Sequence, residues 1–380
     1  MKILFIQNRY WDDRPGGTEQ MCQQLGEGLK ARGHRIAMLT SRSPEGTTVF
    51  HKLWDRLSML NANWLYRGSP AAGAAWLANH FWNYLVTRLV IKDYGPDVVY
   101  VHNSENIQAG PLNASVDSGK RVVIHAHNHL YAQWGRAKGT HSKLGRLIRP
   151  KMENAVFMAV SRHMAGALES SGIPSERIAT IHNGLPDAIF NIAEGKRKDN
   201  SLVFAGHVTE QKGFRVLLEA ADIMRKSRTG IQIDAYGMVP KDEFTDSCLR
   251  FIEEKKMLQN IRVHGPAPRE ALWGIFANSE VFAAPSLGEE SFGLVAAEAM
   301  CCGTIVVASN RGGLPEVVGD AGFLVEPTAD EVARACLEAL GLSATEKDRL
   351  RKMARRRAEE RFRFADRLPE YEAVLSGRLG

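Results

Sequence analysis

Two glutamates stand eight residues apart, with a glycine between them, in the segment Ser286–Met300. Glu290 precedes a predicted helix over 293–301, and Glu298 lies more than one turn inside it. Gly293 lets a ligand approach the backbone closely, and the free amides of a helix start suit phosphate or sugar hydroxyls. Two carboxylates at different points along an elongated ligand, beside an anion site, indicate binding of a sugar nucleotide.

Two other glycine loops each follow the first strand of a predicted domain. Lys212 and Gly213 lie in the loop after a strand over 202–205, at the start of a helix over 213–226. Gly16 and Gly17 lie between a strand over 2–7 and a helix over 18–32. A lysine charge and helix-start amides both stabilise a phosphate, so both loops are predicted anion sites.

Three alternating histidines, His125, His127 and His129, close a predicted strand over 121–126. Alternation points them to one side of the sheet. Three histidines could bind a metal ion. However, alternate strand positions fan out along a sheet and no acid joins the histidines, so we predict no metal site. His102, at the end of the preceding strand, either lines the same cleft or has a structural role.

The surrounding pattern repeats strand, helix and strand with short connections, which indicates parallel sheets with right-handed crossovers. A polar stretch over 187–201 interrupts it and is the predicted linker. The predicted fold is therefore α/β, with two doubly wound domains over 1–186 and 202–358, and a final segment over 359–380. Further predicted strands are 35–40, 97–101, 156–160, 177–181, 231–236, 261–264, 281–284 and 305–308; further helices are 74–93 and 269–277.

Composition narrows the class of protein. The 380 residues exceed what one core usually organises. Five cysteines without a CxxC pair argue against a disulfide framework or a zinc site and favour a reducing cytoplasm. The chain lacks G-x-G-x-x-G and G-x4-G-K-S/T motifs, which argues against dinucleotide dehydrogenases and P-loop enzymes. Aromatic residues do not interleave with the basic runs, so we expect no nucleic-acid partner.

The glutamate segment resembles the E-x7-E signature of the retaining nucleotide-sugar glycosyltransferases of family 4 (glycosyl transferases group 1), which have the GT-B fold. Pro285-Ser286, Gly303 and Gly312-Gly313 occur in the same order as in that family. The loop that ends at Lys212 and Gly213 is similar to the family's G-R-x4-K-G turn, with His207 in place of the usual arginine.

The resemblance implies a role for each of these positions. Glu290 would contact the transferred sugar and Glu298 the ribose, while His127, with His125 as the second choice, would contact the sugar near its reacting carbon. The catalytic pair is then His127 and Glu290. The implied donor-binding residues are Gly16, Gly17, His207, Lys212, Ser291, Phe292, Gly293, Leu294 and Glu298.

The resemblance also implies a GT-B architecture of two Rossmann-like domains facing across a cleft, with the acceptor on the first. It further implies that 359–380 is a C-terminal helix that crosses back to the first domain. The expected reaction transfers a sugar, with retention and without metal, to a glycan, a lipid-linked or a small-molecule acceptor. No cofactor is expected apart from the nucleotide diphosphate sugar, which is a co-substrate. Alternatives on the same fold are a nucleotide-sugar epimerase or phosphorylase, and a non-catalytic sensor suggested by His207.

Two segments are least similar to the family. Trp76 and Trp82, with Phe81, Leu85 and Leu89, fit a helix core better than a sugar platform, and acceptor specificity is expected in this region. The run Arg136 to Lys151 carries basic residues without an acid. It either faces an anionic membrane, as a peripheral contact at the inner face, or is a solvated helix.

Overall fold

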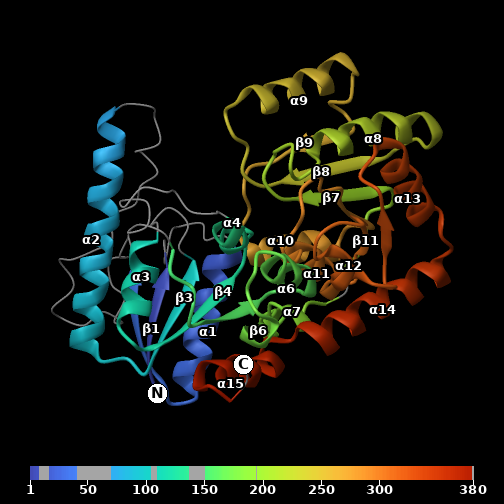
Figure 1. Ribbon diagram of the computed structural model, residues 1–380. Helices are drawn as coiled ribbons and strands as arrows, with labels where there is room; N and C mark the ends of the chain where they lie inside the picture. Colours follow the sequence, from blue (N-terminus) through green and yellow to red (C-terminus); the bar gives the residue numbers. More distant parts are fainter. Residues whose placement is uncertain (8–16, 41–69, 104–108, 137–149, 194, 379–380) are drawn as a thin grey trace. The chain divides into compact units, whose positions relative to one another are not determined.

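The computed structural model describes all residues except 8–16, 41–69, 104–108, 137–149, 194 and 379–380 (Figure 1). The chain divides into two compact units. The first is Met1–Ile181 with Asp366–Gly380, and the second is His182–Ala365. The predicted linker over 187–201 therefore lies within the second unit.

The first unit is built on a parallel sheet with the described strand order β2-β1-β3-β4-β5-β6. Its strands are β1 (Lys2–Gln7), β2 (Arg35–Thr40), β3 (Val98–Asn103), β4 (Arg121–Ala126), β5 (Ala155–Ala159) and β6 (Ile178–Thr180). Runs such as Ile3–Ile6 are fully buried, because helices cover both faces of a parallel sheet. Strand β1 lies between β2 on one side and β3 on the other, so the strand order reverses direction at β1. Ligands of doubly wound sheets bind beyond the carboxyl ends of the strands at such a switch point.

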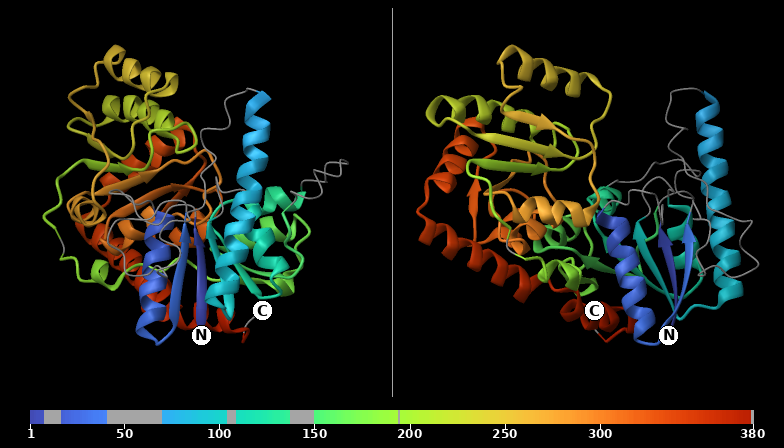
Figure 2. Two further views of the ribbon diagram at one scale, coloured as in Figure 1. Left: turned by 90° about the vertical axis from the view of Figure 1, so that its left-hand side faces the viewer. Right: turned by 180° about the vertical axis from the view of Figure 1, so that it is seen from behind.

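Helices surround this sheet (Figure 2). They are α1 (Gly17–Ala31), α2 (Pro70–Tyr94), α3 (Gly110–Asp117), α4 (Leu130–Arg136), α6 (Arg162–Glu169), the 3-10 turn η1 (Ser175–Arg177) and most of α15 (Phe364–Ser376). Glu372 of α15 accepts from Arg32 Nε at 2.6 Å and lies 3.1 Å from His34 Nε2. These bonds attach the end of the chain to the first unit.

Helix α2 contradicts the prediction that its apolar side chains form a core. Phe81, Trp82, Leu85 and Leu89 are all exposed, and Leu85 is 51% exposed. The buried side is partly polar and includes Asn79, His80, Asn83 and Thr87. This side packs closely on α3, and some of its polar groups bond within α2, such as Asn83 Nδ2 to Asn79 Oδ1 at 3.1 Å and Thr87 Oγ1 to the Asn83 carbonyl at 2.7 Å. Among the described helices, none is long and apolar enough to cross a membrane.

The second unit repeats the architecture, with the described strand order β12-β11-β10-β7-β8-β9, all parallel. Its strands are β7 (Ser201–Ala205), β8 (Gln232–Tyr236), β9 (Ile261–Val263), β10 (Val281–Ala284), β11 (Ile305–Ser309) and β12 (Phe323–Val325). Its helices are α7 (Asp187–Phe190), α8 (Phe214–Ser227), α9 (Glu243–Glu254), α10 (Arg269–Ala277), α11 (Leu294–Cys301), α12 (Leu314–Val318), α13 (Ala329–Gly341) and α14 (Ala344–Phe362).

Alternate residues of these strands face different helices. Val281 and Ala283 belong to the apolar cluster that α8 and α13 form with the sheet. Phe282 lies between them on the opposite face, where its ring packs against Phe276 of α10 at 5.5 Å between centroids. Helices α11 and α14 pack against each other. In this sheet β7 lies between β8 and β10, so the strand order reverses at β7, which marks the switch point.

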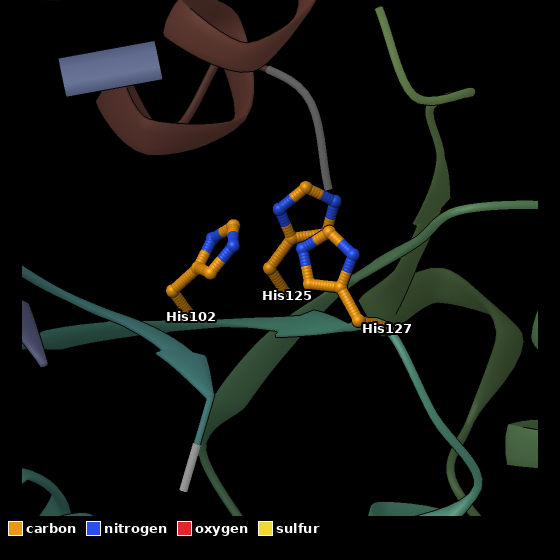
Figure 3. A group of neighbouring side chains, drawn as sticks. All are labelled: His102, His125 and His127. Carbon is orange, nitrogen blue, oxygen red and sulfur yellow. The ribbon is translucent and has the colours of Figure 1, made fainter. Parts of the chain in front are cut away.

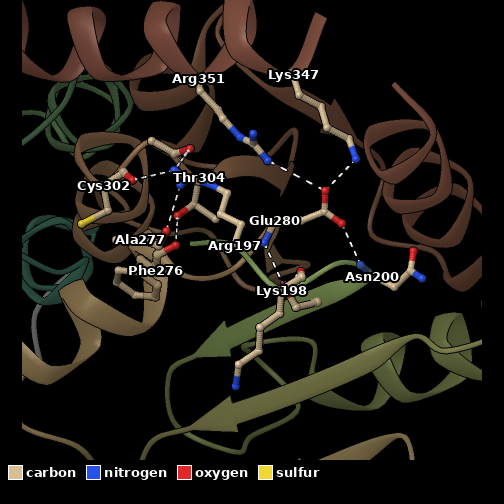
Figure 4. Close-up of polar contacts among 12 residues, drawn as sticks. Arg197, Lys198, Asn200, Phe276, Ala277, Glu280, Cys302, Thr304, Lys347 and Arg351 are labelled. Atoms are coloured by element: carbon tan, nitrogen blue, oxygen red, sulfur yellow. Dashed lines mark hydrogen bonds and ion pairs between the residues drawn. The ribbon is translucent and has the colours of Figure 1, made fainter. Parts of the chain in front are cut away.

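The polar end of the predicted linker is fastened to the second unit (Figure 4). Arg197 donates to the carbonyl oxygens of Ala277, Cys302 and Gly303 at 2.9, 3.0 and 2.6 Å. Its cationic side chain therefore satisfies main-chain carbonyl groups at the carboxyl ends of α10 and α11.

A second polar anchor centres on Glu280, just before β10. Its Oε2 accepts from the backbone amide of Asn200 at 2.7 Å, and its Oε1 from Lys347 Nζ at 2.6 Å. Arg351 Nη2 lies 3.9 Å away (Figure 4). The buried carboxylate is thereby paired, as burial of a charge requires.

Candidate functional site

Two loops at the carboxyl ends of β7 and β10 lie in direct backbone contact. Gly213 adopts a left-handed conformation (φ 70°) at the start of α8, and a Cβ there would overlap the carbonyl oxygen of Pro285. The amide of Gly288 donates to the carbonyl of Gln211 at 2.9 Å. The glycine thus brings the β7–α8 turn against the loop that carries Glu290.

The predicted lysine and glutamate meet in this contact. Lys212 Nζ lies 2.6 Å from Glu290 Oε1, and the hydroxyl of Ser286 donates to the same oxygen at 2.8 Å. Both hydrogen bonds fall on Oε1, and Oε2 has no hydrogen-bond partner in the described part of the chain. The lysine is 40% exposed and the glutamate 19%, so both remain open to a ligand.

The helix that follows begins at the predicted glycine. Gly293 has φ 100° and caps α11, which starts at Leu294. The preceding Phe292 is buried, with its ring against Phe362 at 5.3 Å. The first amides of a helix have no partner inside it and therefore attract anions. The buried aromatic ring fixes where these amides point.

The glycine pair Gly312-Gly313 packs against the backbone of this loop. The amide of Gly313 donates to the carbonyl of Glu290 at 2.6 Å. A Cβ on Gly312 would overlap the backbone of Glu290, and one on Gly313 would lie 2.7 Å from the carbonyl oxygen of Ser291. The two glycines therefore allow a close backbone approach that fixes the loop holding the carboxylate.

Glu298 is buried in α11 and carries a partner that sequence reasoning missed. Arg269, the first residue of α10, donates through Nε to Glu298 Oε1 at 2.6 Å, and its Nη2 lies 2.5 Å from the same oxygen. Burial raises the pKa of Glu298, and the guanidinium opposes that rise. Arg269 carried no motif signal, and Ser286 lay within the motif without an assigned role, because each acts through a contact that only the fold creates.

His207 follows β7, at the entrance of the same turn. Desolvation lowers its pKa below the usual value, and the nearby Lys212 lowers it further. In this state the imidazole is therefore biased toward its neutral form. A bound anion would reverse that bias by favouring the charged form.

In the first unit, Gly17 begins α1, whereas Gly16 lies outside the described residues. Three histidines converge at the ends of β3 and β4, namely His102, His125 and His127 (Figure 3). The ring centroid of His127 lies 3.9 Å from that of His125 and 4.3 Å from that of His102. His127 is partly exposed, whereas His125 is fully buried.

The predicted grouping of His125, His127 and His129 is wrong in one member. Strand β4 ends at Ala126, so the alternation of a strand no longer governs the residues beyond it. His129 lies instead beside His163, with 5.5 Å between ring centroids. His102 takes its place in the cluster.

The converging histidines are the described side chains of this unit that fit a metal best. One nitrogen from each of His102, His125 and His127 lies within 4.8 Å of the others, so the expectation that the alternating histidines fan out does not hold for His125 and His127. Both nitrogens of His102 are hydrogen-bonded, to the Thr18 carbonyl and the Tyr100 hydroxyl. A cation would have to break one of these bonds.

Of the basic run 136–151, residues 137–149 lie outside the described residues. Lys151 closes the run and is held by Asp117, with Nζ 2.6 and 2.8 Å from the two carboxylate oxygens. This end of the run is therefore already neutralised by the chain itself.

Comparison with known proteins agrees with the two-unit architecture. The family profile described as Glycosyltransferase Family 4 matches residues 15–188, and that described as Glycosyl transferases group 1 matches residues 187–361. A phosphatidyl-myo-inositol mannosyltransferase of Mycolicibacterium smegmatis is 27% identical over 94% of this chain and 88% of its own length. A D-inositol 3-phosphate glycosyltransferase of Paenarthrobacter aurescens is 38% identical over 138 residues, which are 35% of this chain and 33% of that protein.

The fold likeness extends over the whole chain. The crystal structure of Anabaena HepE in complex with UDP-glucose aligns with a TM-score of 0.76 at 19% identity, covering 99% of this chain and 100% of that one. The two parallel sheets, the matched profiles and these relatives lead to one conclusion: the chain belongs to the group 1 glycosyltransferases of family 4 and is a hexosyltransferase with the GT-B fold.

Proposed function

We propose that this glycosyltransferase takes a sugar from a nucleotide diphosphate and transfers it with retention of anomeric configuration, without a metal ion. The observation that carries the proposal is the contact of Lys212, Glu290 and Ser286 beside the start of α11. A cation, a carboxylate and the amides of a helix start lie in these two adjacent loops, and they match a ligand with a phosphate at one end and hydroxyls at the other.

Each group has a distinct task in this proposal. Glu290 accepts from sugar hydroxyls through its unengaged Oε2, and Lys212 turns from Glu290 to the diphosphate. Glu298 holds the ribose through Oε2, since both contacts with Arg269 occupy Oε1. The amides over 291–294 bind phosphate and sugar oxygens. These roles agree with those implied by the family resemblance.

The reaction breaks the bond between the anomeric carbon and a diphosphate oxygen, and forms one from that carbon to the acceptor oxygen. The departing phosphate oxygen takes the proton of the acceptor hydroxyl, so no carboxylate nucleophile is needed. Positive charge develops on the sugar and negative charge on the leaving group. Lys212 and the fixed helix-start dipoles stabilise the leaving anion, a task that other enzymes give to a metal ion.

Names of relatives suggest donors and acceptors to test. The structural relative was crystallised with UDP-glucose, and the sequence relatives are named for mannose transfer to phosphatidyl-myo-inositol and for D-inositol 3-phosphate. We propose a polyol phosphate or its lipid as the first acceptor class, with other glycans as the alternative. We also propose a cytoplasmic protein, supported by five buried cysteines that form no disulfide.

The test combines donor binding with product stereochemistry. UDP-glucose, GDP-mannose and ADP-glucose are compared by thermal shift, because a ligand that binds only the folded state raises the melting temperature. The stabilising donor is then incubated with myo-inositol phosphate, and proton NMR reads the anomeric coupling of the product. An inverted anomer would refute retention, and free or epimerised sugar without acceptor would favour a hydrolytic or epimerase reaction.

A further inference from the structure

A series of hydrogen bonds runs from the first turn of α1 into the histidine cluster of the first unit. His102 Nε2 lies 2.8 Å from the carbonyl oxygen of Thr18, and its Nδ1 lies 2.7 Å from the hydroxyl of Tyr100. The same hydroxyl lies 2.5 Å from His125 Nδ1. We call Thr18, Tyr100, His102 and His125 the histidine chain.

The direction of every bond in the histidine chain follows from the chemistry of its groups. The Thr18 carbonyl only accepts, so His102 Nε2 carries the hydrogen. Burial lowers the pKa of His102 to about 3, so the ring is neutral and its Nδ1 must accept from Tyr100. Burial also raises the pKa of Tyr100, which keeps its single hydrogen.

The Tyr100 oxygen, having given its hydrogen to His102, can only accept from His125. His125 Nδ1 therefore carries the hydrogen, and its Nε2 carries a lone pair, because burial lowers the pKa of His125 and keeps the ring neutral. That Nε2 is buried and has no hydrogen-bond partner in the described part of the chain. The two histidines are thus held as opposite tautomers by one hydroxyl.

These fixed rings support a third one. His127 lies across both His102 and His125 (Figure 3). Neither supporting ring can turn without breaking a hydrogen bond of the histidine chain. We propose that Tyr100, His102 and His125 are positioning residues, which hold the ring of His127 in the orientation in which it meets the donor sugar. This inference rests on the proposed function, and on the contact of His127 with the donor sugar that the family resemblance implies.

The surroundings favour a neutral support. The other titratable groups that face Tyr100 and His125 are Cys22 of α1, Tyr131 of α4 and Tyr371 of α15, all buried. Burial raises the pKa of Cys22 and of Tyr371, so neither carries a charge at neutral pH. No described carboxylate contacts the rings to stabilise an imidazolium.

The far end of the histidine chain gives it a second purpose. Thr18 follows Gly17 in the first turn of α1. The family resemblance implies that Gly17 binds the donor. By accepting from His102, the Thr18 carbonyl links that turn to the histidine that contacts the sugar. One set of hydrogen bonds therefore holds both proposed donor contacts of the first unit.

The experiment reads the tautomers directly. Long-range proton–nitrogen NMR of the full chain labelled with 15N-histidine reports which ring nitrogen carries hydrogen, and His102→Gln and His125→Asn supply the assignments. We expect His102 with hydrogen on Nε2 and His125 with hydrogen on Nδ1, both unchanged from pH 5.5 to 8.5. Tyr100→Phe should move the His125 hydrogen to Nε2 and lower kcat about tenfold, the effect of one lost hydrogen bond, with donor Kd within about twofold.

Controls separate positioning from folding. Tyr94→Phe removes a hydroxyl that donates to the Arg35 carbonyl at 2.8 Å, at the start of β2, and should change neither tautomers nor kcat. If Tyr100→Phe does not fold, His102→Leu takes its place, because leucine has no acceptor, frees the Tyr100 hydrogen for His125 and predicts the same tautomer change. Hydrogen on His125 Nε2 in the wild type, or unchanged kcat in a variant with the altered tautomer, overturns the inference. Absence of transfer from UDP-glucose, GDP-mannose and ADP-glucose would count against the proposed function, while the tautomers still decide the histidine chain.

Discussion

Lys212 and Glu290 form an ion pair, with 2.6 Å between Nζ and Oε1. The side chain proposed to bind the phosphate and the side chain proposed to bind the sugar therefore neutralise each other. Both side chains are partly exposed, and pairs of this kind stabilise a fold by only about 0–1 kcal/mol. A diphosphate, with more negative charge than one carboxylate, can therefore draw the lysine away at little cost. The pair keeps each group in place before the donor binds.

Replacing Glu290 by alanine should abolish most of the transfer activity while the fold persists. Loss of a hydrogen bond to a charged group costs about 1.5–3 kcal/mol, or roughly ten- to a hundredfold in kcat when it acts in the transition state. The neighbouring exposed glutamate provides the matched control, since Glu289→Ala removes the same charge one residue away. Steady-state kinetics of both variants decide the matter, and near-normal turnover by Glu290→Ala would remove it from the site.

Gly213 should tolerate alanine far less well than Gly230. Both have a left-handed backbone, with φ 70° and 77°. A Cβ on Gly213 would overlap the Pro285 carbonyl, whereas one on Gly230 would meet only Asn200 Nδ2 at 3.6 Å. Gly230→Ala should therefore lower the free energy of unfolding by about 1–2 kcal/mol from backbone strain alone, and Gly213→Ala by clearly more. Equal losses in urea denaturation would mean that the loop contact is not rigid.

Much of the fold could be predicted because its periodic signals are strong. The strand 2–7 and the helix 269–277 agree with the structure at both ends, since buried apolar runs and a proline before the helix mark them. The short α7 and α12 carry too few residues for a period, and the predictions did not include them. The prediction for helix α2 failed for another reason: Phe81, Trp82, Leu85 and Leu89 are exposed while Val86, Val90 and Ile91 are buried, so burial does not follow hydrophobicity there.

The site could be predicted where motif and loop position coincide, and not where contacts are made across the fold. Lys212 and Glu290 lie 78 residues apart, yet each was found from its own loop. Arg269 reaches Glu298 only because α10 and α11, which precede and follow β10 in the chain, pack against each other. His102 joined the histidine cluster through the pairing of β3 with β4, which no local pattern contains.

Chelation should leave transfer activity unchanged. The proposal neutralises the leaving diphosphate with Lys212 and helix-start amides. Both ring nitrogens of His102 are engaged in hydrogen bonds, so a cation in the histidine cluster would have to break one of them. Initial rates are measured with and without EDTA after dialysis, with added manganese and magnesium as comparisons. A large loss with EDTA, restored by either ion, would contradict metal independence and would point to the cluster of His102, His125 and His127.

His207 should make donor binding depend on pH. In the free protein, desolvation and then Lys212 hold its pKa below the usual value of about 6.5. A bound diphosphate favours the imidazolium and raises that pKa, so binding should take up part of a proton between the two values. The charged contact is present below the bound-state pKa and is lost as pH rises through it. Donor affinity should therefore fall with rising pH.

Two substitutions and one calorimetric comparison make this prediction decisive. His207→Arg keeps its charge throughout, so its affinity should not change with pH and should match or exceed that of the wild type in alkali. His207→Ala should weaken binding most at low pH, where the wild type carries the charge. Titration calorimetry of the donor in two buffers with different ionisation enthalpies measures the proton taken up, which His207→Arg should abolish. A wild-type affinity that is flat from pH 6 to 9 and equal to that of His207→Ala would mean that the imidazole does not reach the phosphate, because a contact that titrates cannot leave affinity constant across its own pKa.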